Sequence, residues 1–361
     1  MSGSTRETRL WAHLHRTGPA AGELPTQADT PWYLAVLTGI AAWVAAVFAF
    51  LFVIESFDRM WSEPWRALAA GAVCAVAALG LLRWARGRVF QEQLGLATSL
   101  AGQSLMGLGL VQGTERAFES GMAWLPWCGI AAIALAMHAL GRLPLHRFLC
   151  GGIFAAGVLG ACIADAQASR VVAAPLLAWL ALVAWWRSEA NDRFAPGLSP
   201  LAWALSMMAL LAVGFVDLDN WRFERYGASA AWLRPLGDAL MLPLLPACTA
   251  WLLRRQARVA LRTRVALVAL SWLLALACWR APGVTLATTL ALIGFALHRP
   301  MLLIVGTCGI GGYLLRYYFQ LDTTLLEKSG WLLAAGAVLL LARFVARRGL
   351  HAEAPPPGEA P

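Results

Sequence analysis

Long apolar runs separated by short polar segments dominate the chain from residue 32 to residue 346. A helix needs about 20 residues to cross a bilayer, within a range of roughly 17–25. Runs of this kind cover 32–54, 66–82, 94–111, 122–141, 148–164, 171–186, 200–216, 236–253, 265–279, 284–297, 300–315 and 325–346. Several are short. The pattern therefore predicts an all-α, polytopic transmembrane helical bundle of about 12 spans, with a range of roughly 10–12.

Proline and glycine refine this picture at three places. Pro31 follows Thr30, and Pro64 lies two residues after Ser62. A hydroxyl cap with proline in the first turn is typical of a helix start. The glycine-rich stretch 306–312 lies inside a predicted span. It predicts either close helix packing or a local break in that helix.

Composition agrees with the membrane class. Apolar residues make up 60% of the chain and charged residues 14%, whereas soluble proteins average about 45–50% and about 25%. The polar residues 1–30 are interpreted as a cytoplasmic N-terminal segment without a secretory signal. Residues 31–348 form the predicted polytopic membrane domain. The acidic, proline-rich residues 349–361 are predicted to be a disordered cytoplasmic tail.

The net charge of +9 changes the picture through its distribution. Arginines lie in short clusters between apolar runs, which is typical of membrane topology and not of a nucleic-acid-binding face. With both termini cytoplasmic, 19 of the 29 Lys and Arg residues fall on the inner side. This asymmetry favours an even number of spans with both ends inside. The expected partner is the lipid bilayer, and no nucleic acid is expected.

Motifs for catalysis or metal binding are absent from the sequence. The seven cysteines form no Cys-x-x-Cys pair, and no His-Glu-x-x-His helix occurs. Ser104 and His138 could suggest a serine hydrolase, but their predicted depths differ by roughly 10 Å. A nucleophile and its base need hydrogen-bond contact. We therefore expect no enzyme activity, no cofactor and no metal.

The third apolar run is unusually polar for a membrane helix. Gly95, Ser99, Gln103 and Gly107 recur every four residues and so share one helix face. One interpretation is a close helix–helix contact across which Gln103 forms a hydrogen bond. The other is a face that lines a pore or a solute site.

The densest polar chemistry lies between the last two runs, from Arg316 to Lys328, the only lysine of the chain. The charge distribution places this segment on the outer side, at the level of Asp238. We predict an outward-facing polar vestibule there, because charges near hydrocarbon usually have a function. The alternative is structural: Thr324 and Glu327 have capping-box spacing, and Lys328 could extend to the headgroups. The candidate solute or partner site comprises Lys328, Glu327, Asp322, Arg316, Asp238 and Gln103.

The same segment resembles a known family. Residues 317–329, read as Tyr-Tyr-Phe-Gln-Leu-Asp-Thr-Thr-Leu-Leu-Glu-Lys-Ser, are similar to the C-terminal signature of the bacterial membrane family called domain of unknown function 4401. Residues 31–34 with Trp43, and residues 90–104, agree with it. The resemblance implies a bacterial membrane protein that is encoded near a small membrane-anchored protein with a Gly-Asp-Tyr motif, or is joined to another uncharacterised membrane domain. It carries over no catalytic residues.

The expected function follows from these observations together. We expect a multi-pass protein of the bacterial inner membrane that acts as an accessory or structural subunit with a membrane-anchored partner. The alternative is a small-solute transporter or channel with an outward-facing polar vestibule. The sequence does not specify a small-molecule ligand.

Overall fold

The computed structural model describes residues 37–45, 47–48, 51, 63–85, 88–114, 122–164, 169–218, 233–256, 259–279, 281–320 and 325–351. These ranges consist of helices and short connections, and no strand occurs within them. Five stretches are long and apolar enough to cross a membrane: Pro64–Trp84, Val89–Gly113, Pro144–Ala164, Ala195–Gly214 and Leu236–Arg254. The predicted all-α class is therefore confirmed for the described residues, and these five stretches could span a membrane.

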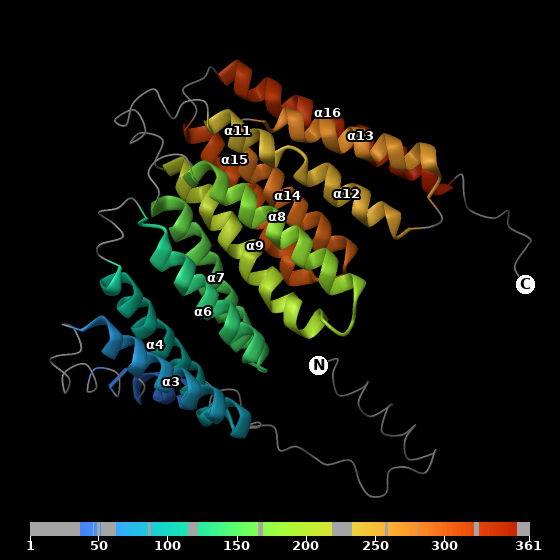
Figure 1. Cartoon of the computed structure of the whole chain (residues 1–361). Helices are drawn as coiled ribbons and strands as arrows, with labels where there is room; N and C mark the ends of the chain where they lie inside the picture. The colour runs from blue at the N-terminus through green and yellow to red at the C-terminus, as the bar shows by residue number, and fades with distance from the viewer. Residues whose placement is uncertain are drawn as a thin grey trace, which may run out of the picture.

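The helices form one bundle in which neighbours run side by side (Figure 1). A helical segment at 37–45 comes first. The later elements are α3 (Pro64–Trp84), α4 (Val89–Gly113), α6 (Leu125–Leu140), α7 (Pro144–Ala164), α8 (Ser169–Ala190), α9 (Ala195–Leu218), α11 (Leu233–Met241), α12 (Leu244–Arg254), α13 (Leu261–Ala277), α14 (Pro282–Ala296), α15 (Pro300–Gln320) and α16 (Leu325–His351). The short connections α6–α7, α8–α9 and α14–α15 all lie at one end of the bundle.

Three differences between the structure and the predictions are informative. The run 236–253 is divided into α11 and α12, because Pro243 has no N–H to continue the hydrogen-bond ladder. Pro64 opens α3 as predicted, but the capping position belongs to Glu63, which makes no side-chain cap bond. Finally, α16 continues to His351, past the predicted boundary at 348.

Small residues bring neighbouring helix backbones close together. A Cβ on Gly102 of α4 would lie 2.8 Å from the Gly71 carbonyl oxygen of α3. A Cβ on Gly306 of α15 would lie 2.4 Å from the Ala291 amide nitrogen of α14. Such positions accept no larger side chain unless the helices move apart. The stretch 306–312 therefore lies in a continuous helix, and Gly306 serves close packing.

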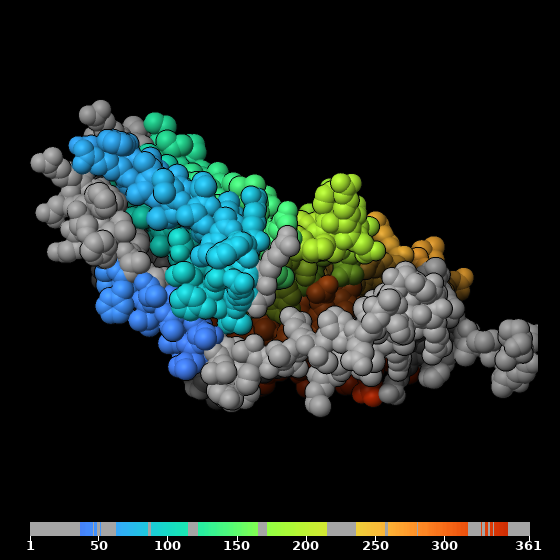
Figure 2. Space-filling model, turned by 90° about the horizontal axis from the view of Figure 1, so that it is seen from below, coloured from blue at the N-terminus to red at the C-terminus, as the bar shows by residue number. Residues whose placement is uncertain are grey.

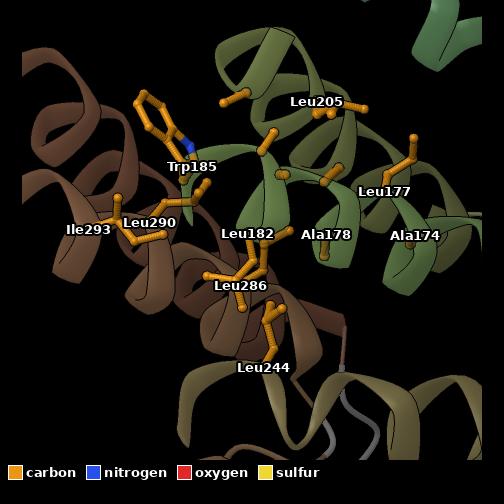
Figure 3. Packing of buried hydrophobic residues seen from close by; sticks show 14 of the residues in the cluster. Ala174, Leu177, Ala178, Leu182, Trp185, Leu205, Leu244, Leu286, Leu290 and Ile293 are labelled. Atoms are coloured by element: carbon orange, nitrogen blue, oxygen red, sulfur yellow. The ribbon is translucent and has the colours of Figure 1, made fainter. Parts of the chain in front are cut away.

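The largest core lies among α8, α9, α12 and α14 and consists mainly of Ala and Leu (Figure 3). Trp185 of α8 is fully buried within it, and its indole nitrogen donates to Ser206 Oγ of α9 at 3.1 Å. Leu290 and Ile293 approach it from α14. Lipid tails are as apolar as leucine, so close packing and this internal hydrogen bond, and not apolar burial alone, hold these helices together.

Arg147 joins α7 to the start of α9. Its Nη1 donates to the Pro196 carbonyl oxygen at 2.9 Å, and its Nε donates to the Gly141 carbonyl oxygen at 2.8 Å. The Pro196 carbonyl needs an outside donor, because its usual partner four residues later would be the N–H of Pro200, which proline lacks. The guanidinium therefore compensates for a proline inside another helix.

Widening the α3–α4 contact should destabilise the protein. We expect Gly102→Leu to lower the unfolding free energy by about 1–3 kcal/mol, the usual cost of overpacking. The measurement is unfolding of the purified chain in mixed detergent micelles, followed by circular dichroism. Gly80→Leu is the matched control, because a Cβ at Gly80 meets no described atom within 4 Å. Equal stability of the two variants would contradict the close contact.

The role of Arg147 can be tested by a double-mutant cycle. Arg147→Met should destabilise the chain, and should do so less in a Pro200→Ala background, where the new N–H can bond to Pro196. We expect a coupling of about 0.5–1.5 kcal/mol, the net value of one hydrogen bond. Arg147→Met also removes the bond to the Gly141 carbonyl oxygen, but this loss is the same in both backgrounds and so does not contribute to the coupling energy. Additive effects would show that Arg147 does not compensate for Pro200.

Candidate functional site

The six residues of the candidate site lie in different parts of the chain, and the structure describes the side chains of only three of them. Gln103 is buried in the middle of α4, and Asp238 is half-buried on α11. Arg316 is half-buried near the end of α15, where its Nη1 donates to the Gly214 carbonyl oxygen of α9 at 2.7 Å. Asp322 lies outside the described residues. Glu327 and Lys328 belong to the backbone of α16, and their side chains are outside the description.

Gln103 does not belong with Arg316. Helix α4 packs against α3 and α6, and α6, α7 and α9 separate it from α15 (Figure 1). The view from below shows the same separation, with residues 64–113 gathered on one flank (Figure 2). The structure therefore does not bring Gln103 together with Arg316 in the candidate solute or partner site. The membrane depth of a residue can be inferred from its position along a predicted span, whereas the identity of the helices that pack around that span cannot.

The capping-box interpretation of the last segment stays a prediction. Helix α16 begins at Leu325, directly after Thr324. This is where a cap at Thr324 would place the first helical residue. Thr324 itself lies outside the described residues, so its predicted bond stays a prediction.

Gln103 instead belongs to a buried polar cluster between α4 and α7, which we call the α4–α7 cluster. It comprises Ser99, Gln103, His146 and Cys150, all at most 5% exposed. Ser99 Oγ lies 2.9 Å from His146 Nε2. Gln103 Nε2 donates to Ser99 Oγ at 3.3 Å and to Cys150 Sγ at 3.4 Å. The predicted polar face of α4 thus forms hydrogen bonds to a neighbouring helix.

Sequence reasoning found half of this cluster. Ser99 and Gln103 were on the predicted polar face, one turn apart. His146 and Cys150 are spaced i,i+4 on α7 and so share a face. That spacing was an available signal, but nothing in the sequence pairs α7 with α4. The serine of α4 that contacts a histidine is Ser99, whereas Ser104 is exposed.

His138 contacts two backbone carbonyl groups, which is a structural role and not that of a catalytic base. Its Nδ1 lies 2.8 Å from the Arg147 carbonyl oxygen, and its Nε2 lies 3.1 Å from the Gly197 carbonyl oxygen. Both ring nitrogens therefore face backbone acceptors of α7 and α9. The ring ties three helices together, which agrees with the rejection of a Ser104–His138 dyad.

A charged cluster lies at the end of the bundle that carries the α8–α9 and α14–α15 connections. Glu189 lies between Arg299, at 3.2 Å, and Arg255, at 3.5 Å. Arg299 also donates to Ser199 Oγ at 3.3 Å and lies 5.1 Å from the Trp185 ring centroid. Exposed ion pairs contribute little individually, but a shared carboxylate makes a network. This network links α8, α9, α12 and the α14–α15 connection.

The chemistry of the α4–α7 cluster is that of a closed site. It places a thiol, an imidazole, a hydroxyl and an amide in contact, and none of them is open to solvent. No group of three His, Cys, Asp or Glu residues that could hold a metal occurs in the described ranges. A nucleophile that acts on a soluble substrate would need access that this arrangement does not give.

Comparison with known proteins identifies a family that matches the chain. No curated protein and no solved structure matches the chain. The family described as Domain of unknown function (DUF4401) matches residues 31–349, which include every helix from α3 to α15 and nearly all of α16. The match confirms the resemblance seen in the C-terminal signature. The chain belongs to the family DUF4401.

Proposed function

We propose that the chain is a twelve-span protein of the bacterial inner membrane with both termini in the cytoplasm. Its role is that of an accessory or structural subunit for a membrane-anchored partner protein. The helices between residues 37 and 351, with α11 and α12 counted as one crossing, correspond in order to the twelve apolar runs. The arginine-rich connections then face the cytoplasm, in keeping with the positive-inside rule.

The observation that carries the subunit role is an exposed face of small side chains on α15, which we call the α15 face. It comprises Thr307, Cys308, Gly311 and Gly312. Within the described part of the chain, a Cβ at Gly311 or Gly312 meets no atom within 4 Å. Thr307–Gly311 and Cys308–Gly312 both have the small-xxx-small spacing through which membrane helices approach closely.

Larger side chains border this face. Met301, Ile304 and Leu315 are 68%, 55% and 62% exposed. Together they shape a shallow apolar surface with an accessible backbone at its centre. A single transmembrane helix of a partner is the occupant that suits such a surface, since van der Waals packing on small residues drives helix association in lipid.

The interior gives the transporter alternative less support. The hydroxyls of Ser206, Thr289 and Ser188 donate to carbonyls of their own helices, at 2.7, 2.8 and 2.9 Å. These groups are satisfied and offer no donor to a passing solute. The surrounding core is Ala and Leu. Close packing of this kind favours a scaffold over a conduit.

A leucine on the α15 face should remove the partner. We expect Gly311→Leu to abolish co-purification of a stoichiometric membrane-anchored protein from mild detergent, while the abundance of the chain stays unchanged. Mass spectrometry of the purified complex is the measurement. Gly152→Leu on α7 is the matched control, because a Cβ there also meets no described atom within 4 Å. Retention of the partner by Gly311→Leu would refute the α15 face as its binding surface.

The orientation has its own test in a background in which serine replaces the native cysteines. A cysteine introduced by Asp322→Cys should react with a membrane-impermeant maleimide in intact spheroplasts. A cysteine introduced by Gln256→Cys, in the exposed α12–α13 connection, should react only after the membrane is opened. The reverse pattern would invert the topology.

A further inference from the structure

The α4–α7 cluster brings two strong metal ligands to metal-binding distance. Cys150 Sγ lies 3.6 Å from His146 Nε2. An ion bound about 2.3 Å from a thiolate sulfur and about 2.0 Å from an imidazole nitrogen would join them at an angle of about 110°. Both residues lie on one face of α7, so the helix itself fixes this separation.

The imidazole is also held in place from its other side. A Cβ on Gly141 would lie 2.1 Å from His146 Nδ1. The ring therefore packs directly on the α6–α7 connection, at a position where only glycine leaves room. Its Nε2 is thereby directed toward Ser99 and Cys150. A ligand whose orientation is fixed by packing binds a metal without the cost of ordering it.

The side chains around Cys150 include further sulfur atoms, which are soft metal ligands. Cys150 belongs to a packed, buried group with Met106 of α4 and Met137 of α6. Sulfur ligands favour soft ions such as Cu(I) and Zn²⁺, whereas Mg²⁺ and Ca²⁺ require oxygen ligands. Protein Zn²⁺ sites use thiolate, imidazole and carboxylate ligands, so a thioether favours Cu(I) of the two. Cys150 therefore has an imidazole nitrogen within 3.6 Å and two thioether side chains in the same packed group. This composition indicates a monovalent, thiophilic ion.

A second observation points to a bound species. Gln103 is 5% exposed, and its Oε1 has no hydrogen-bond partner. The Nε2 of the same amide donates to Cys150 Sγ, a bond that stabilises an anionic, metal-binding sulfur. The amide therefore supports the sulfur through Nε2 and keeps a buried acceptor, Oε1, without a partner inside the protein.

We propose that Cys150 and His146 bind one Cu(I) ion, with a thioether of Met106 or Met137 as the further ligand. The copper stays Cu(I), and the Cys150 thiol loses its proton to solvent as the sulfur–copper bond forms. Ser99 and Gln103 are positioning residues that hold the imidazole and the sulfur. This site is independent of the α15 face and of any partner protein.

The test is anaerobic titration of the purified full-length chain with Cu(I), in competition with the chromophoric chelator bicinchoninate. We expect one Cu(I) per chain, lost in Cys150→Ser and in His146→Leu. Gln103→Leu should weaken binding about 10- to 100-fold, as is usual for residues that support a metal ligand. Copper X-ray absorption should show sulfur and nitrogen scatterers, the nitrogen being absent in His146→Leu.

Matched controls separate the site from general thiol binding. Cys248→Ser removes an equally buried cysteine of α12 and should bind Cu(I) as the wild type does. The double variant Met106→Leu, Met137→Leu conserves volume, so it should fold and still bind more weakly. The proposal is overturned if Cys150→Ser binds like the wild type. It is equally overturned if the wild type leaves all copper on the chelator, or if Zn²⁺ competes at equal concentration.

Discussion

The closeness of helix backbones is the constraint on which the rest of this structure depends. Inside a bilayer the hydrophobic effect does not drive one helix against another, because lipid and leucine are alike. Van der Waals contact must replace it, and contact grows as backbones approach. Gly71 with Gly102, and Gly306 with Ala291, set this distance for two helix pairs. The alanine-rich core around Trp185 extends the same principle through α8, α9, α12 and α14.

Close packing leaves little room for polar atoms, and the chain satisfies them in two ways. Hydroxyls such as Ser206 and Thr289 turn back on their own helices. Arg147 and His138 instead reach carbonyls at the starts of neighbouring helices. The second solution ties the start of one helix to another helix, and at Pro196 it supplies the donor that Pro200 lacks. Side chains join helices inside the packed interior as well, as the Trp185–Ser206 and Ser99–His146 contacts do.

The sequence predicted which segments are helices because apolar length alone decides that in a membrane. Pro243 divided one predicted span, an effect that hydrophobicity does not report. The partnership of α4 with α7 could not be predicted, because periodicity defines a face but not its neighbour. For the same reason Gln103 was grouped with Arg316, although α6, α7 and α9 lie between their helices. Ser99 and Gln103 were found, whereas His146 and Cys150 required the tertiary structure.

The Glu189 network has a consequence for how the protein is made. Its carboxylate lies on α8, whereas its two guanidinium partners come from residues 255 and 299, which emerge from the ribosome later. The Arg255 pair therefore cannot form before α12 has been made, and the Arg299 pair cannot form before α14 has been made. The order of synthesis thus makes the joining of α8 to α12 and to the α14–α15 connection a late step in assembly.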